Sequence, residues 1–202
     1  MSVASLLETY SSMWQFVGAS PIVTGATPTV AVPAGYQSGD LLMIFTAHDL
    51  NTPAGWTLVT GANNPTSCFV KIATSNESSV VMSGGSASNV TAMLAYRDVS
   101  SATPDAVGVV TFGVAVLSAG TQSVNTTQAW DLVLSLFSTD ATAATLTPPA
   151  GISNRILSNP TASLYGLVVS DELQASVGAT AVRTMQASVA ESIYTVTIAF
   201  LK

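Results

Sequence analysis

Few residues of this chain have side chains that could do chemistry, and the first of them is its single histidine, His48, beside Asp49. A Ser–His–Asp triad needs an activated serine and an oxyanion hole, and the sequence contains no Gly-x-Ser-x-Gly elbow. A zinc site needs more histidine and cysteine ligands than the one of each that the chain holds. We therefore interpret His48 as a solvated loop residue, and we predict no catalytic residue, no metal and no cofactor.

Acidic pairs are the next candidates, because two carboxyl groups can hydrolyse a glycoside. The pairs are Asp98 with Asp105, and Asp171 with Glu172. The 11 acidic residues are scattered, mainly over turn-like segments, so chance pairs are expected. Adjacent side chains on a strand point to opposite faces, which makes Asp171 and Glu172 a poor catalytic pair. Calcium ligation by loop oxygens is not supported by any EF-hand pattern.

Three tryptophans, Trp14, Trp56 and Trp130, could offer platforms on which sugars stack. Trp56 and Trp130 border predicted buried strands, so we interpret them as core or rim packing. Trp14 follows an N-terminal segment whose apolar residues have helical spacing. Aromatic side chains anchor protein interfaces, and we predict a subunit contact in this segment. The residues of that contact are Leu6, Leu7, Tyr10 and Trp14.

The composition argues against several classes of partner. Charged residues make up 8% of the 202 residues, and the net charge is −6. The five basic side chains are scattered, whereas proteins that bind nucleic acid or anionic membranes cluster them. We therefore predict neither of those partners. Because so low a charge does little to keep copies apart, we expect surfaces for self-association.

The chain start also bears on where the protein acts. Its first ten residues lack the basic and long apolar regions of a secretory signal. No apolar run approaches the ~20 residues that span a bilayer. We therefore expect synthesis in a host cytoplasm without a signal peptide.

The run Leu41–Phe45 is apolar at every position, which predicts a strand that is covered on both faces. Turn residues precede and follow it. A weaker copy of the same pattern of turn, strand and turn appears around the mostly apolar run 132–137. We interpret the turn residues of both copies as scaffold corners. They are Gly39, Asp40, Pro53, Gly55, Asp131, Pro149 and Gly151.

This repeated pattern predicts an internal duplication. We expect the functional residues to lie in the segments that do not repeat. The alignment equates Asp40 with Asp131, Gly55 with Gly151, Phe69 with Tyr165, and Tyr96 with Phe200. We expect one all-β domain over residues 13–202, an antiparallel β-sandwich of jelly-roll type with about 12–14 strands. Its pseudo-repeats span about 13–106 and 107–202. Residues 1–12 are expected to form an N-terminal arm or a short helix.

Several motifs occur in a recognisable order from about residue 14 to the end. They are Val32–Leu42, Pro53–Leu58, Ala95–Val99, Pro148–Gly151 and Asp171–Thr180. Together they resemble an all-β module of bacteriophage virion proteins and bacterial surface proteins. The resemblance implies a sandwich fold and a place on the exterior of a virion or cell, and it carries over no catalytic residues.

We therefore expect a non-enzymatic bacteriophage virion structural protein, a capsid decoration or cement protein on the exterior of the particle. Its expected partners are copies of itself, in a homotrimer, and the major capsid or tail protein. The alternative is a tail-associated module that binds a receptor or a carbohydrate.

Overall fold

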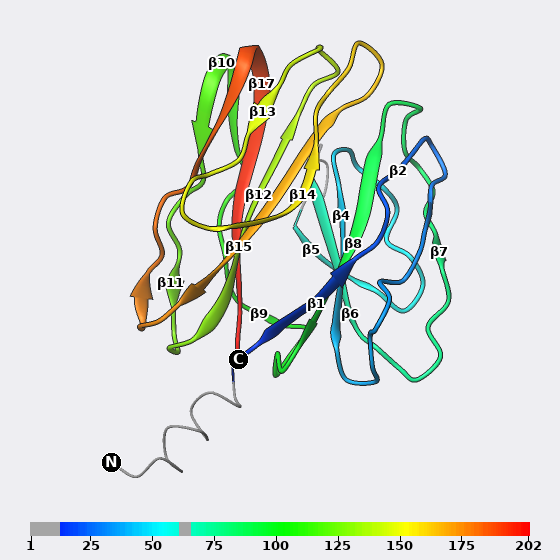
Figure 1. Cartoon of the computed structure of the whole chain (residues 1–202), viewed down its shortest axis with the longest axis vertical. Coiled ribbons are helices and arrows are strands. Elements are labelled where there is room, and N and C mark those ends of the chain that lie inside the picture. Colours follow the sequence, from blue (N-terminus) through cyan, green and yellow to red (C-terminus); the bar gives the residue numbers. More distant parts are fainter. Residues whose placement is uncertain (1–12, 61–65) are drawn as a thin grey trace.

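The fold is all-β, as predicted from the sequence. The computed structural model describes residues 13–60 and 66–202, and every regular element in this part of the chain is a strand. Two antiparallel sheets pack face to face as a sandwich (Figure 1). The predicted N-terminal arm or helix, residues 1–12, lies outside the described residues.

The first sheet comes entirely from the N-terminal half of the chain. Its strands run in the order β1, β8, β4, β6, β5. Their bounds are β1 Gln15–Ala19, β8 Val90–Arg97, β4 Leu41–Thr46, β6 Ser67–Ile72 and β5 Thr57–Thr60. The short β2 (Val23–Thr24) also pairs with β8, and β3 (Thr29–Val30) pairs with β7 (Val80–Val81) in a separate ribbon.

The second sheet comes entirely from the C-terminal half. Its strands run in the order β10, β17, β12, β15, β14. Their bounds are β10 Thr111–Gly120, β17 Thr184–Phe200, β12 Asp131–Thr139, β15 Gly166–Gln174 and β14 Ser153–Ser158. Both β9 (Pro104–Val107) and β13 (Leu146–Thr147) pair with β17, and β11 (Asn125–Thr126) pairs with β16 (Gly178–Ala179). The described residues form 17 strands, more than the 12–14 expected, because several strands have only two residues.

The two sheets therefore share one strand order, and the pairing register relates them residue by residue. Leu41 lies opposite Tyr96 in the first sheet, as Leu132 lies opposite Phe200 in the second. The edge strands β5 and β14 each carry an irregularity at the same place, around Val59 and Arg155. Each half of the chain thus builds one sheet of the sandwich. This topology does not establish the jelly-roll connection, which stays a prediction.

One predicted equivalence, Phe69 with Tyr165, is wrong. Leu41 also pairs with Ile72, and Leu132 pairs with Leu173, so the partner of Phe69 by register is Ser170. Tyr165 instead precedes β15. Short apolar runs look alike when slipped by a few residues, and only the ladder of hydrogen bonds sets their register.

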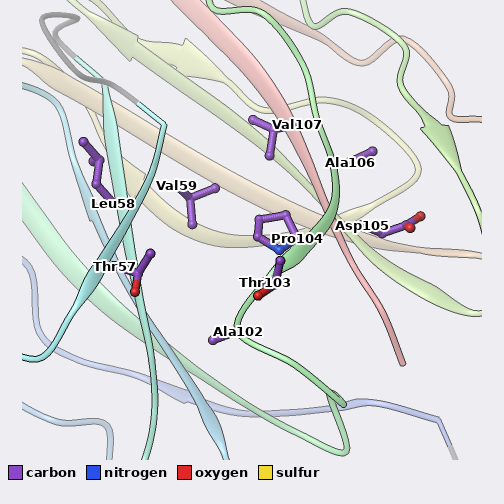
Figure 2. Close-up of a pocket in the computed structure, with 9 residues that line it drawn as sticks. All are labelled: Thr57, Leu58, Val59, Ala102, Thr103, Pro104, Asp105, Ala106 and Val107. Carbon is purple, nitrogen blue, oxygen red and sulfur yellow. The ribbon is translucent and has the colours of Figure 1, made fainter.

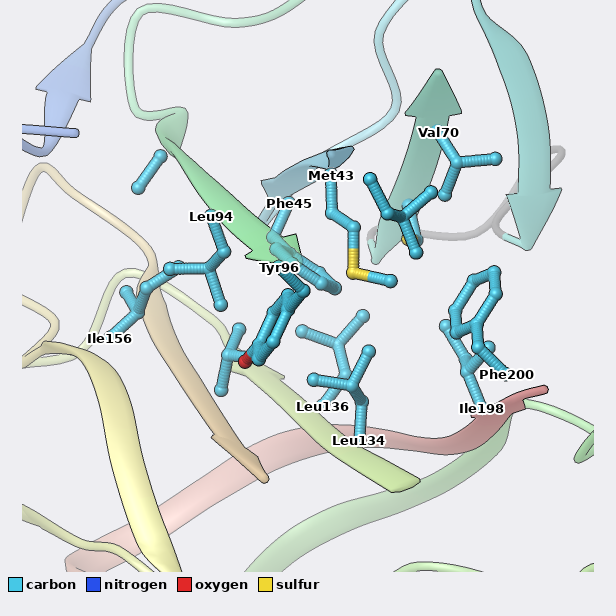
Figure 3. Close-up of a cluster of buried hydrophobic side chains, with 14 of the residues drawn as sticks. Met43, Phe45, Val70, Leu94, Tyr96, Leu134, Leu136, Ile156, Ile198 and Phe200 are labelled. Carbon is cyan, nitrogen blue, oxygen red and sulfur yellow. The ribbon is translucent and has the colours of Figure 1, made fainter. Parts of the chain in front are cut away.

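A large apolar cluster fills the space between the sheets (Figure 3). The labelled residues of the first sheet are Met43, Phe45, Val70, Leu94 and Tyr96; those of the second are Leu134, Leu136, Ile156, Ile198 and Phe200. A second cluster covers the other face of the first sheet, and a third covers that of the second. Because both faces are covered, every residue of β4 and β12 is buried. Trp56 packs in the second cluster, whereas Trp130 is partly exposed.

The predicted corner residues flank the central strands. Gly39, Gly55 and Gly151 adopt positive φ angles of 95°, 78° and 78°. Trp56 N–H donates to the carbonyl of Pro53 and closes that turn. Pro149 is buried, Asp40 directly precedes β4, and Asp131 is the first residue of β12. Trp130, with a φ of 72°, takes the place that Gly39 has in the first half.

Candidate functional site

The sandwich has an opening on each of two sides. At each opening, an edge strand of one sheet faces the strand of the other sheet that comes first in the sequence. On one side β5 faces β9, and a cavity of about 290 Å³ lies between them (Figure 2). On the other side β14 faces the segment that enters β1, and the cavity there measures about 580 Å³. Because β5 corresponds to β14, and β9 to β1, the two openings are equivalent places in the duplicated fold.

The opening between β5 and β9 is lined mostly by apolar side chains, and we call it the apolar edge. Leu58, Val59, Pro104 and Val107 line its cavity, and Asp105 is its one charged lining residue (Figure 2). Val59 also packs on the cluster between the sheets.

The opening between β14 and β1 contains buried charge, and we call it the polar edge. The carboxylate of Asp171, on β15, is buried completely. Its Oδ2 accepts hydrogen bonds of 2.7 Å from the Tyr96 hydroxyl and of 2.7 Å from Arg155 Nε. The Arg155 guanidinium in turn lies 4.1 Å from the centre of the Phe16 ring. Burial, and then the charge of Asp171, raise the pKa of Tyr96 well above its usual value, so the phenol stays a donor.

Trp14 joins this cluster from the segment before β1. Its ring meets that of Tyr96 edge to face, at 5.7 Å between centres. Among the described residues, neither its Nε1 nor the Oδ1 atom of Asp171 has a hydrogen-bond partner, although both atoms are buried. Trp14 and Asp171 line the same cavity. The predicted role of Trp14 in a subunit contact stays a prediction, and Leu6, Leu7 and Tyr10 lie outside the described residues.

The pairing register shows which residues hold the same places at the apolar edge. Asp171 pairs with Ser153 as Val70 pairs with Thr57, which makes Asp171 the counterpart of Val70. Arg155 likewise corresponds to Val59, and Tyr96 to Phe200. The fold thus closes one edge with Val59, Val70 and Phe200 and the other with a tyrosine, a carboxylate and a guanidinium.

Three of the four acidic residues considered as catalytic pairs have other partners in the structure. Asp171 is bonded inside the sandwich, whereas Glu172 forms an ion pair with Arg183. Asp105 accepts hydrogen bonds from the backbone and hydroxyl of Thr127. The structure brings Asp105 close to Asp131 instead of to Asp98.

Asp131 contrasts with its counterpart Asp40. Arg97 donates to both oxygens of Asp40, at 3.0 and 2.9 Å, but the residue that corresponds to Arg97 is Leu201. Asp131 is fully buried, and its charged neighbour is Asp105 instead of an arginine. Burial, and then the neighbouring Asp105, raise the pKa of Asp131 to about 6, and the backbone of Lys202 only partly opposes this rise.

His48 lies in the loop that follows β4. Its ring stacks on Tyr165, and its Nδ1 lies 3.1 Å from the carbonyl oxygen of Asp49. Residues 13–60 and 66–202 contain no group of three or more His, Cys, Asp or Glu side chains placed to hold a metal ion. Burial raises the pKa of the Cys68 thiol, and the side chain lies inside the core.

A surface that the sequence reasoning did not single out lies on β10. Phe112, Val114 and Leu117 of this edge strand are exposed by 51%, 66% and 59%. From 113 to 120, β10 pairs with the N-terminal part of β17, and the described part of the first sheet has no such extension. The sequence feature that could have indicated this surface is the absence of charged residues from 106 to 130.

Comparisons with protein-family models, with curated proteins and with solved structures find no match to this chain. Within the described residues, no helix is long and apolar enough to cross a membrane.

Proposed function

We propose that the protein is a non-enzymatic structural component on the exterior of a bacteriophage particle, a capsid decoration or cement protein that acts through contacts with copies of itself. The observation that carries this proposal is the exposed apolar row Phe112, Val114 and Leu117 on an uncharged edge strand. The placement on a virion rests on the resemblance of the sequence motifs described above. The major capsid or tail protein is the second proposed partner.

The chemistry of β10 supports a contact surface. Exposed edge strands of monomeric proteins are commonly blunted by lysine, proline or inward charges, and β10 has none of these. Val116 and Ala119 pack into the third cluster, while Phe112, Val114 and Leu117 stay exposed. Contiguous exposed apolar surface usually marks an interaction site.

A second copy of the chain is the partner that this surface fits best. Each copy carries a net charge of −6, so two copies repel least where both are uncharged, and the stretch 106–130 provides that. The Phe112 ring is already held by stacking on Tyr194, with 4.3 Å between ring centres. Irregular pairing on both sides of Val116 interrupts the ladder, so contact through side chains is favoured over a continuous intermolecular sheet.

The test is the oligomeric state of the full chain by sedimentation equilibrium and light scattering. We expect a stable trimer, and Val114→Lys or Leu117→Lys should weaken its association roughly ten-fold or more, since burial of such a side chain contributes ~1.5–3 kcal/mol. Val81→Lys is the matched control, because Val81 is equally exposed, at 67%, but lies on β7. A monodisperse wild-type monomer at high concentration would overturn the proposal.

The location on the particle needs a separate measurement. Gold-labelled antibody and electron microscopy of phage particles should show many copies distributed over the shell. Label confined to the tail would favour the tail-associated alternative, and absence from particles would refute a virion role.

A further inference from the structure

The polar edge holds two buried polar atoms whose hydrogen-bonding capacity is unused. Asp171 Oδ1 is an acceptor and Trp14 Nε1 is a donor, and neither has a partner among the described residues. Unpaired buried polar atoms destabilise a fold by about 1–3 kcal/mol each, so a group that completes the hydrogen bonds of both atoms would bind favourably. Both residues line the cavity of about 580 Å³ between β14 and the start of β1.

The fold itself does not require polar residues at this place. At the apolar edge the counterparts of Asp171, Arg155 and Tyr96 are Val70, Val59 and Phe200, and all three pack on the cluster between the sheets. Replacing a buried ion pair by well-packed apolar residues is often neutral or stabilising. The polar cluster is therefore better explained by a ligand than by stability.

The charges around the cavity indicate what kind of ligand fits. Arg155 compensates Asp171 at 2.7 Å, and Arg183 compensates Glu172, so the site is close to neutral. A cation would meet Arg155 beside the carboxylate, and an anion would meet the carboxylate itself. What remains is a neutral molecule that offers a hydroxyl donor to Asp171, an acceptor to the indole N–H, and a C–H face to the Trp14 ring.

We propose that the cavity at the polar edge binds an uncharged saccharide, with Asp171 Oδ1 and Trp14 as its recognition groups. Its volume is within the range of small-ligand sites, about 300–1,000 Å³. Both atoms are shielded from water, so the proposal requires the Trp14 side chain to shift before a sugar can reach them. Trp14 lies outside the strand ladder, since β1 begins at Gln15, and this shift breaks no strand pairing. The site does not depend on the self-association proposed for β10.

The test uses the full chain and a panel of neutral sugars: glucose, galactose, N-acetylglucosamine, maltose and lactose. The chain has three tryptophans, so a ¹H–¹⁵N spectrum contains three indole signals, and the one that Trp14→Phe removes belongs to Trp14. At least one sugar should shift that signal in a saturable way. No shift with any sugar up to 50 mM, or a shift of the other indole signals alone, would refute the site.

Affinities of variants separate recognition from folding. Trp14→Phe keeps an aromatic ring but removes the N–H, and it should weaken binding about five-fold, as expected for one hydrogen bond. Asp171→Asn should weaken binding about ten-fold, because a charge-assisted bond is lost. Trp130→Phe is the matched control and should leave affinity unchanged. Equal affinity of the Trp14→Phe variant and its control, or stronger binding of choline than of any sugar, would overturn the proposal.

Discussion

At the apolar edge the sandwich is closed by two valines and a phenylalanine, whereas at the polar edge the same three places hold Arg155, Asp171 and Tyr96. The strand order and the pairing register are shared by the two halves, so the backbone does not explain the difference. Apolar side chains are therefore sufficient to fill the space between the sheets at an edge of this sandwich. The charges at the polar edge are not required by the fold, and we attribute them to the ligand site proposed above.

The largest expected effect comes from breaking the polar cluster. Asp171→Val leaves Arg155 and the Tyr96 hydroxyl without their shared carboxylate, and removal of one partner of a buried ion pair destabilises by about 3–5 kcal/mol. Urea unfolding followed by tryptophan fluorescence measures this loss.

Placing the residues of the apolar edge at the polar edge tests whether the two edges are interchangeable. The triple variant Tyr96→Phe, Arg155→Val and Asp171→Val should recover to within about 1 kcal/mol of the wild type, or exceed it. If the triple variant is as unstable as the single one, the two edges are not interchangeable and the comparison fails.

A smaller effect on folding stability is expected from replacing Asp131, whose surroundings differ from those of Asp40. The pKa of Asp131 is raised from 3.8 to about 6, so the folded chain binds its proton more tightly than the unfolded chain does. Through this group, folding stability rises as the pH falls from 7 towards 4. Asp131→Asn removes the charge and should stabilise the protein at pH 7 by about 1–2 kcal/mol, after allowance for solvent screening.

The pH series provides the control for that prediction. The advantage of Asp131→Asn should shrink as the pH falls and disappear near pH 3, below the ordinary pKa of 3.8, where the wild-type carboxyl is protonated in both states. Asp40→Asn should have the opposite sign at pH 7, because it removes the ion pair with Arg97. Thermal unfolding at several pH values measures the stability of both variants. If both substitutions stabilise the protein at pH 7, or both destabilise it, the difference between the two aspartates is refuted.

The smallest effect concerns the turns, where the two halves should respond alike. Gly55 and Gly151 both have a φ of 78°, and a Cβ at either position would meet no atom within 4 Å. Replacement by alanine therefore has only a conformational penalty, ~1–2 kcal/mol for a left-handed residue. The two single variants should lose equal stability in urea unfolding, and a clear inequality would show that the turns are not equivalent.

The fold class could be read from the sequence because it depends on local patterns. The apolar run Leu41–Phe45 predicts a strand with two covered faces, and β4 is buried throughout. The equivalence of Phe69 with Tyr165 failed because alternating apolar runs do not carry their own register. The exposure of β10 was not predicted for a related reason, since an apolar strand looks the same in the sequence whether it lies in a core or at an edge.

The candidate site was accessible from the sequence only in part. Trp14 was singled out as an interface residue, and Asp171 was considered only with its neighbour Glu172. No spacing along the chain indicates that Asp171 meets Tyr96, which lies 75 residues away. That contact exists because the two halves pack their sheets face to face.

The sequence by itself determined that this chain is a β protein, because period, turn residues and side-chain volume act over a few neighbouring residues. Only the tertiary structure decided which carboxylates are paired, which edge is polar and which apolar strand stays exposed. Those properties depend on contacts between segments far apart in the chain. The same residue types, Asp40 and Asp131, therefore differ in their surroundings: one meets an arginine, and the other a second carboxyl group.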